Sequence, residues 1–260
     1  MIIIDTEKCS GCGQCVQDCL PHYLTLINGK AQVSGDRCLE CGHCVAVCPQ
    51  EAVQMAGYAK GLTYAPAERT VAPDLLAHFM QWRRSIRQFQ DRSVPRELLE
   101  QIIDAGRMTP TGSNTQSPAY IVLENDLPLV RAQAVETLYR RSQDETNPYR
   151  ESLARIYQDS LAGCDTLFYD APVVILVLDR QPNGINGALA ASRMELMAAS
   201  LGLGVCFVGF FVQAIDSDPA LRQLLDLPEG VRPITSLAVG YPSVTYHRTA
   251  PRRPAEVSWR

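Results

Sequence analysis

The sequence predicts an α+β protein in two parts, and three observations lead to this prediction. Eight of the ten cysteines lie before residue 49, which sets the first 56 residues apart in composition. Beyond residue 73, apolar runs suited to buried strands alternate with segments of helical periodicity. Residues 57–73, which lie between these two regions, contain two glycines and two prolines and show no clear periodicity. We therefore expect a small domain at 1–56, a linker at 57–73 and a larger domain at 74–260.

Composition narrows the classes of function. The 260 residues are 46% hydrophobic and 20% charged, as in ordinary globular proteins, with a net charge of −4. No basic field is present to attract nucleic acid, and no apolar run is long enough to span a membrane. The first residues also lack the pattern of a secretory signal. We expect a soluble, cytoplasmic protein without nucleic-acid or membrane partners, in which dense cysteines indicate metal binding or catalysis.

The first part contains an internal duplication. Its cysteines follow the spacing C-x2-C-x2-C-x3-C twice, and each cysteine of the second run lies 29 residues after its counterpart. Asn28-Gly29 stands between the short β-like runs 25–27 and 31–33, which predicts a hairpin. The two runs are Cys9, Cys12, Cys15 and Cys19, and Cys38, Cys41, Cys44 and Cys48.

Residues 1–56 resemble a two-cluster bacterial ferredoxin, in which the fourth cysteine of each run serves the other cluster. This resemblance implies two [4Fe–4S] clusters that move single electrons. Structural zinc and disulfides are the alternatives. Zinc leaves the third and fourth cysteines at fixed offsets unexplained, and a reducing compartment disfavours disulfides. Pro49 follows Cys48 as in the family, whereas Pro21 is displaced by one position from Cys19. The implied ligands are Cys9, Cys12, Cys15 and Cys48 for one cluster, and Cys38, Cys41, Cys44 and Cys19 for the other.

The second part predicts a buried sheet with helices. Asp74 is expected to cap a helix that reaches Trp82, and a second helix is expected from Pro95 until Gly106 ends it. Gly202 is expected to stop a helix before a buried strand. Further helices are expected at about 127–143, 150–163, 187–201 and 218–225, and strands at 119–123, 172–178, 204–209 and 234–239.

Two polar segments of this part suit a phosphorylated heteroaromatic ligand. Arg83-Arg84-Ser85-Ile86-Arg87 concentrates guanidinium groups and a hydroxyl that suit a dianionic phosphate. The loop 109–118 carries carboxamides that can pair with a ring edge. Arg252 and Arg253, near the C-terminus, are candidates for the same phosphate. Taken one at a time, each basic group reads more simply as a solvated surface.

Together these segments resemble the nitroreductase family of FMN flavoproteins over about residues 75–255. The matching motifs are Arg83 to Phe89, the loop 110–116, the turn 200–209, and Gly240-Tyr241-Pro242 with Arg252. The resemblance implies a nitroreductase-like α+β sandwich that follows a ferredoxin-like domain. Val208 stands where family members often have an acidic residue, which leaves a backbone donor near flavin N5. The implied FMN-binding residues are Arg83, Arg84, Ser85, Arg87, Thr111, Asn114, Gln116, Val208, Gly209, Arg252 and Arg253.

The resemblance also implies a homodimer with FMN at the interface, and Val257 and Trp259 are candidates for packing on the partner. No side chain stands out as a catalytic acid or base, so the chemistry is expected at FMN N5. Cys164 and Cys206 are expected to be small buried residues.

The favoured function is an oxidoreductase whose clusters feed FMN to reduce a small organic acceptor such as a nitroaromatic or a quinone. NAD(P)H and an external ferredoxin are the candidate electron donors. Three alternatives stay open. In the first, NAD(P)H reduces FMN directly and the clusters are the electron outlet. In the second, the flavin part oxidises, dehalogenates or rearranges its substrate. In the third, the protein is an electron carrier without enzymatic activity.

Overall fold

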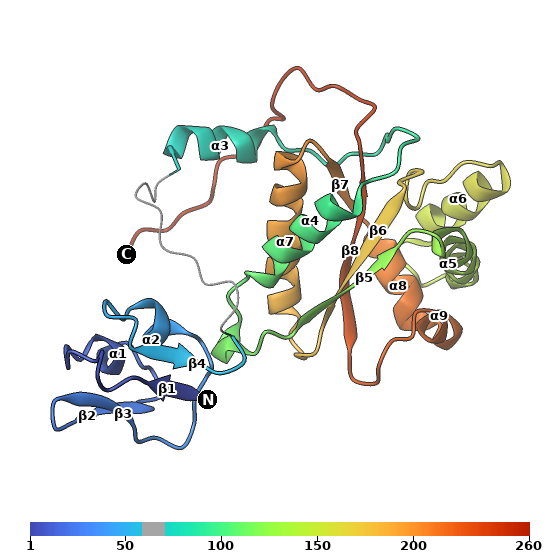
Figure 1. Cartoon of the computed structure of the whole chain (residues 1–260). Helices are drawn as coiled ribbons and strands as arrows, with labels where there is room; N and C mark the ends of the chain where they lie inside the picture. The colour runs from blue at the N-terminus through green and yellow to red at the C-terminus, as the bar shows by residue number, and fades with distance from the viewer. Residues whose placement is uncertain (59–70) are drawn as a thin grey trace. The chain divides into compact units, whose positions relative to one another are not determined.

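The computed structural model describes residues 1–58 and 71–260, and its contacts divide the chain into two compact units (Figure 1). The first unit is Met1–Thr70 together with Thr111–Thr115, and the second is Val71–Pro110 together with Gln116–Arg260. Part of the expected linker, residues 59–70, lies outside the described residues. Among the residues that are described, no helix has the length and apolar character to cross a bilayer.

The first unit shows the duplication in its backbone. Each cysteine run passes through a four-residue helix whose preceding glycine, Gly13 or Gly42, is left-handed with φ of 78° or 73°. Asn28 and Gly29 both have positive φ and turn the chain between two paired strands, as the sequence predicts. The elements are β1 (Ile2–Ile4), α1 (Gln14–Gln17), β2 (Leu24–Ile27), β3 (Lys30–Val33), α2 (His43–Ala46) and β4 (Val53–Met55), with β1 antiparallel to β4.

The second unit is built on an antiparallel four-stranded sheet in the order β5-β6-β8-β7. The central strand β6 is buried along its whole length, because helices cover both faces of the sheet. This agrees with its unbroken apolar sequence. The strands are β5 (Pro118–Leu123), β6 (Val173–Asp179), β7 (Gly204–Phe207) and β8 (Arg232–Gly240).

Two groups of helices flank this sheet. The helices α4 (Arg96–Arg107) and α7 (Ile185–Ser200) pack on one face (Figure 1). The opposite face is covered by α5 (Leu127–Ser142), α6 (Arg150–Leu161), α8 (Gly209–Ser217) and α9 (Pro219–Leu224). The two apolar cores therefore lie on either side of the sheet, which is the predicted α+β layer arrangement.

The structure corrects several local predictions. Gly106 does not end α4 but lies buried within it, where a Cβ would come within 2.7 Å of Tyr120 Oη. Asp74 lies in the first turn of α3 (Pro73–Trp82), and Ala72 is the residue at its N-cap. The sequence predicts a strand at 204–209, but the strand ends at Phe207 and Gly209 begins the helix α8. Cys206 is buried as predicted, whereas Cys164 is exposed. Gly202 is left-handed and follows α7, as predicted.

Candidate functional site

The first unit brings its cysteines together in two groups of four. The thiols of Cys48, Cys9 and Cys12 lie close enough to Cys15 for their charge to raise its pKa. Those of Cys38, Cys41 and Cys19 act in the same way on Cys44. We call these groups the first cysteine set (Cys9, Cys12, Cys15 and Cys48) and the second cysteine set (Cys38, Cys41, Cys44 and Cys19). They are the groups that the sequence predicts, and the role of their members as ligands stays a prediction.

Both sets have features that suit a polynuclear cluster. A small cavity is bounded by all four members of the first cysteine set. Backbone amides donate to the sulfurs in both sets: Ala52 N to Cys48 Sγ over 3.3 Å, and Tyr23 N to Cys19 Sγ over 3.2 Å. Such bonds to ligand sulfurs are typical of iron–sulfur sites. Within the described ranges, no three His, Cys, Asp or Glu side chains form a site for a single metal ion.

Burial affects the protonation of these thiols. It raises the pKa of Cys15, and it raises the pKa of Cys44 to about 11, with the neighbouring thiols adding to both shifts. Hydrogen bonds from the amides of Ala31 and Gly11, together with the charge of Lys30, lower the pKa of Cys9. Iron that binds these sets must therefore displace protons from the buried thiols.

In the second unit, the arginine segment lies along the edge strand β7. Ile86 N donates to Val205 O over 2.9 Å, and Ser85 forms a parallel bridge with Val205. Gly204 makes this close approach possible, since a Cβ there would lie 2.5 Å from Ile86 Cγ1. The predicted phosphate-binding segment is thereby held beside the strand that leads to Val208 and Gly209.

The arginines of this segment have different partners. Arg83 forms an ion pair with Glu195 of α7, whose side chain is 9% exposed. Burial raises the pKa of Glu195, and Arg83 opposes this shift. Arg84 uses Nη1 to donate to Gln81 O and Arg83 O. Its Nη2 is buried and lacks a hydrogen-bond partner among the described residues. A buried guanidinium nitrogen without an acceptor fits a site for an anionic group.

The backbone at Val208 and Gly209 connects the sheet with α8. Val208 N donates to Ser236 O, and Ser236 Oγ donates to Val208 O, both over 2.9 Å. Both backbone groups of Val208 are thus used to hold β8. Gly209 is the first residue of α8, where amide groups point out of the helix without partners inside it. Of the two predicted N5 neighbours, Gly209 is therefore the one whose amide is placed to serve a ligand.

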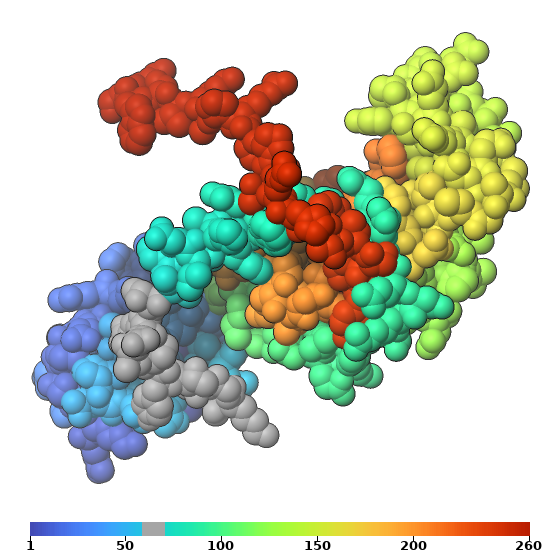
Figure 2. All heavy atoms as spheres, turned by 90° about the horizontal axis from the view of Figure 1, so that it is seen from above, coloured from blue at the N-terminus to red at the C-terminus, as the bar shows by residue number. Residues whose placement is uncertain are grey.

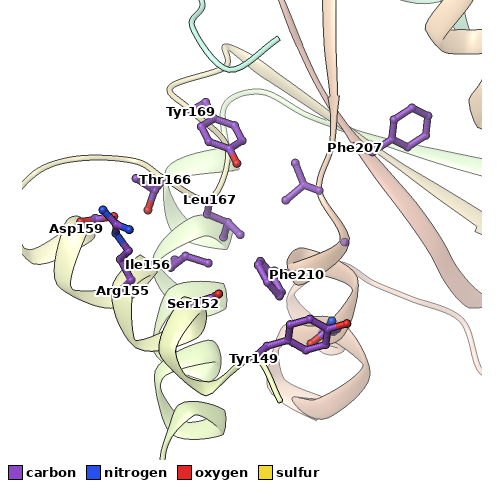
Figure 3. Close-up of a pocket in the computed structure, with 13 residues that line it drawn as sticks. Tyr149, Ser152, Arg155, Ile156, Asp159, Thr166, Leu167, Tyr169, Phe207 and Phe210 are labelled. Carbon is purple, nitrogen blue, oxygen red and sulfur yellow. The ribbon is translucent and has the colours of Figure 1, made fainter. Parts of the chain in front are cut away.

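A cavity of about 510 Å³ opens beside these residues (Figure 3). Val208 and Gly209 line it, and its walls carry aromatic side chains from α8, β7 and the segments that flank α6. Tyr149 and Phe210 meet edge to face across it, with ring centroids 5.7 Å apart. Thr166 Oγ1 is buried in its wall and has no partner in the described parts of the chain. The volume and the aromatic lining suit a flat organic molecule.

Arg87 links this cavity to β7. Its guanidinium lies 6.0 Å from the ring centroid of Tyr169, which lines the cavity. The same guanidinium lies beside Cys206, where burial raises the pKa of the thiol and Arg87 lowers it. Arg87 is thus brought close to the wall of the cavity that Val208 and Gly209 line, and a binding site shared by these residues stays a prediction.

The other predicted ligand-binding residues are not in the lining of this cavity. The loop Thr111–Thr115 belongs to the first unit, where Asn114 Nδ2 donates to Leu39 O over 3.1 Å and to Glu40 O over 2.9 Å. Asn114 and Gln116 have positive φ. Arg252 and Arg253 are exposed in the C-terminal tail, whose last residues extend from the body of the second unit (Figure 2).

Comparison with known proteins identifies this architecture. Residues 80–241 match the model of the nitroreductase family. The chain belongs to the nitroreductase family. It is thus an oxidoreductase, and the α+β fold and the family predicted from the sequence are confirmed. Residues 1–58 of this nitroreductase-family enzyme match the model of a 4Fe-4S dicluster domain.

Several curated proteins resemble this family member. One, from Methanothermobacter thermautotrophicus and provisionally named NADH dehydrogenase/NAD(P)H nitroreductase, is 31% identical over 62% of this chain and 74% of its own. An NADPH-dependent oxidoreductase from Staphylococcus haemolyticus is 24% identical over 65% of this chain and 66% of its own. An iodotyrosine deiodinase from Hydra vulgaris is 27% identical over 63% of this chain and 64% of its own.

Solved structures share the nitroreductase fold. A nitroreductase with bound FMN from Desulfitobacterium hafniense superposes with a TM-score of 0.57 at 24% identity, over 70% of this chain and 97% of its own. A second nitroreductase with bound FMN, from Bacteroides fragilis, superposes with a TM-score of 0.56 at 21% identity, over 70% of this chain and 98% of its own.

Sequence reasoning missed most of the cavity wall of this nitroreductase. Phe207 and Phe210 flank the predicted N5 dipeptide, so their positions offered a signal. Tyr149, Ser152 and Arg155 offered none, because their approach to residue 208 depends on how α6 is placed by its packing against α5.

Proposed function

We propose that this protein is an iron–sulfur flavoprotein. Two [4Fe–4S] clusters in the first unit exchange single electrons with FMN in the second, and FMN reduces a small organic acceptor in the cavity beside Val208 and Gly209. The observation that carries the proposal is this cavity, which joins an aromatic lining to the start of α8 and has Arg87 over the ring of Tyr169 in its wall. The same chain contains two sets of four cysteines.

The residues of the second unit fit FMN. Arg84 offers an unpaired buried nitrogen to the phosphate, and Ser85 and Arg87 of the same segment are further candidates for it. The Gly209 amide, at the positive end of α8, suits the negative charge of a reduced flavin ring. FMN supplies the change between one-electron and two-electron chemistry. The residues of this chain bind and orient it and hold an aromatic acceptor against it.

The acceptor is a nitroaromatic, a quinone or a similar flat molecule. The aromatic pair Tyr149–Phe210 supports this class, and Thr166 Oγ1 offers one hydrogen bond to its polar edge. We expect Ser152→Trp to fill part of the cavity and raise KM for menadione about 10-fold with unchanged FMN content. Ser160→Trp, also on α6 but outside the cavity lining, is the control.

NAD(P)H is a second candidate electron donor, supported by the names of two relatives, and the clusters would then be the outlet. Anaerobic titration with NADH, NADPH and a reduced ferredoxin separates the two directions. Flavin bleaching by NADPH before any change at the clusters would count against cluster input. Deiodination is a further outcome to test, because deiodinases are among the relatives.

We also propose a cytoplasmic homodimer. The C-terminal tail supports this assembly, since Val257 is 59% and Trp259 91% exposed, and so does α3, which buries no residue in the monomer. Light scattering of the full chain and of a chain that ends at residue 248 tests whether the tail is needed for the dimer.

The first experiment is a visible spectrum with iron, sulfide and FMN quantification. We expect eight irons and one FMN for each chain. A protein without flavin or iron–sulfur absorption after anaerobic reconstitution would contradict the proposal. Negligible turnover with all acceptors, despite full loading with FMN and iron, would indicate an electron carrier.

A further inference from the structure

The two cysteine sets are not equivalent in their surroundings. Because the two cysteine runs are offset by 29 residues, Ser10 and Gly11 in the first run are the counterparts of Leu39 and Glu40 in the second run. Gly11 is covered by the β2–β3 turn, because a Cβ on it would lie 2.1 Å from Gly29 O. At the counterpart position, the carbonyl groups of Leu39 and Glu40 instead accept hydrogen bonds from Asn114.

Asn114 acts on a peptide group that already serves the second cysteine set. Its Nδ2 donates to Leu39 O over 3.1 Å. The N–H of the same peptide group, Glu40 N, donates to Cys38 Sγ over 3.3 Å. A donor at the carbonyl end of a peptide group polarises it and makes its N–H a stronger donor. Asn114 therefore strengthens a hydrogen bond to a ligand sulfur without touching the sulfur itself.

The loop that carries Asn114 is held in an unusual conformation. Ser113 and Asn114 have φ of 50° and 52°, and Glu40, which receives one of the bonds, has φ of 51°. Left-handed conformations at residues other than glycine cost free energy and persist where surrounding contacts fix them. The two bonds from Asn114 to neighbouring carbonyls are such contacts, so the loop and the Cys38–Cys41 segment form one connected structure.

We propose that Asn114 is a positioning residue that raises the potential of the cluster on the second cysteine set, so that electrons collect on this cluster of higher potential and pass from it to FMN. Hydrogen bonds to ligand sulfurs stabilise the more negative reduced state and thereby raise the potential. The inference rests on the proposed function, in which clusters in the first unit exchange electrons with FMN in the second.

The redox step balances as single-electron transfers. One electron leaves the reduced cluster of the second set, which is oxidised, and reduces FMN. A second electron follows by the same route from the cluster of the first set. Two protons from solvent complete the two-electron reduction. A low-potential one-electron donor restores the clusters, and dithionite takes this part in the experiment.

Matched cysteine variants identify the cluster that reduces FMN. Cys12→Ala and Cys41→Ala remove counterpart, exposed members of the two sets. In the full chain loaded with FMN and iron, we expect stopped-flow reduction of FMN by dithionite-reduced clusters to slow at least 10-fold in Cys41→Ala. The first electron in Cys12→Ala is expected to arrive at the wild-type rate. The reverse pattern, or equal rates, would overturn the assignment.

Asn114 variants test the tuning with a readout other than activity. The cysteine variants assign the two EPR signals, and redox titration then gives their potentials. We expect Asn114→Ala to lower the potential of the second-set signal alone, and Asn114→Asp to lower it further because a carboxylate adds negative charge and cannot donate. Ser113→Ala, in the same loop, is expected to change neither signal.

Unchanged potentials in both Asn114 variants, or a shift of the first-set signal, would refute the tuning. These failures differ from failure of the proposed function, which would appear in the wild-type protein as missing iron or missing FMN.

Discussion

The ion pair between Arg83 and Glu195 permits a quantitative prediction. Arg83→Met leaves the Glu195 carboxylate, 9% exposed, without its cation. Breaking a buried pair in this way costs about 3–5 kcal/mol, and the 23% exposure of the Arg83 side chain places the cost near the lower end. We expect urea denaturation at pH 8 to show a loss of about 3 kcal/mol in the free energy of unfolding.

The loss depends on pH with a defined sign. Burial already raises the pKa of Glu195 in the folded protein, and removal of Arg83 raises it further. A carboxyl with a raised folded pKa binds its proton more tightly in the folded state, so the variant loses stability as pH rises through that pKa. The cost of Arg83→Met is therefore smaller at pH 5 than at pH 8.

Two further variants complete this test. In the Arg83→Met variant, a second substitution, Glu195→Gln, removes the unpaired buried charge. We expect the double variant to recover all but about 1 kcal/mol of the lost free energy of unfolding. Arg84→Met leaves the ion pair intact and is expected to weaken FMN binding at least about 10-fold, as measured by flavin fluorescence. A loss below about 1 kcal/mol for Arg83→Met, equal at both pH values, would refute the reasoning.

Three other predictions concern stability and metal. Asp218, which caps α9 and accepts hydrogen bonds from Thr137, Gln133 and Arg140, has its pKa lowered to about 2. Asp218→Ala should cost about 3 kcal/mol at pH 7, and chemical denaturation should show the gap from wild type closing as pH falls from about 4 towards 2. Gly106→Ala should lower the free energy of unfolding by about 1–3 kcal/mol, since its Cβ would lie 2.9 Å from Met194 Cγ; no loss in urea denaturation would show that α4 and α7 can separate cheaply. Chelation of iron should increase amide hydrogen exchange in residues 1–58 and leave β6 protected, and equal exchange before and after would show that the metal does not hold the first unit together.

The sequence predicted the parts of this protein whose signal is local. The Asn28-Gly29 turn and the buried strand β6 each depend on neighbouring residues, and each was found as expected. The cysteine spacing likewise indicated the dicluster domain that residues 1–58 match. The family followed from short motifs in order. Gly106 was misread because a helix-ending glycine and a glycine that admits a neighbouring helix look alike in sequence.

The candidate site was harder to predict because it depends on distant packing. Nothing in the order of residues pairs Arg83 with Glu195 or brings Tyr149 to Phe210, since each pair joins separate elements. The use of Val208 N by Ser236 was also hidden, because it depends on the register of β7 and β8. Local motifs thus indicated which residues to consider, and only the fold distinguished their partners.

The membership of Thr111–Thr115 in the first unit has a consequence for biosynthesis. The ribosome makes residues 71–110, which belong to the second unit, before it reaches this loop. The cysteine-rich unit therefore stays incomplete until α4 has been translated. Iron insertion during synthesis would meet a second cysteine set whose Leu39 and Glu40 carbonyls still lack Asn114. The maturation of the proposed cluster would then be tied to the translation of α4 and the loop that follows it.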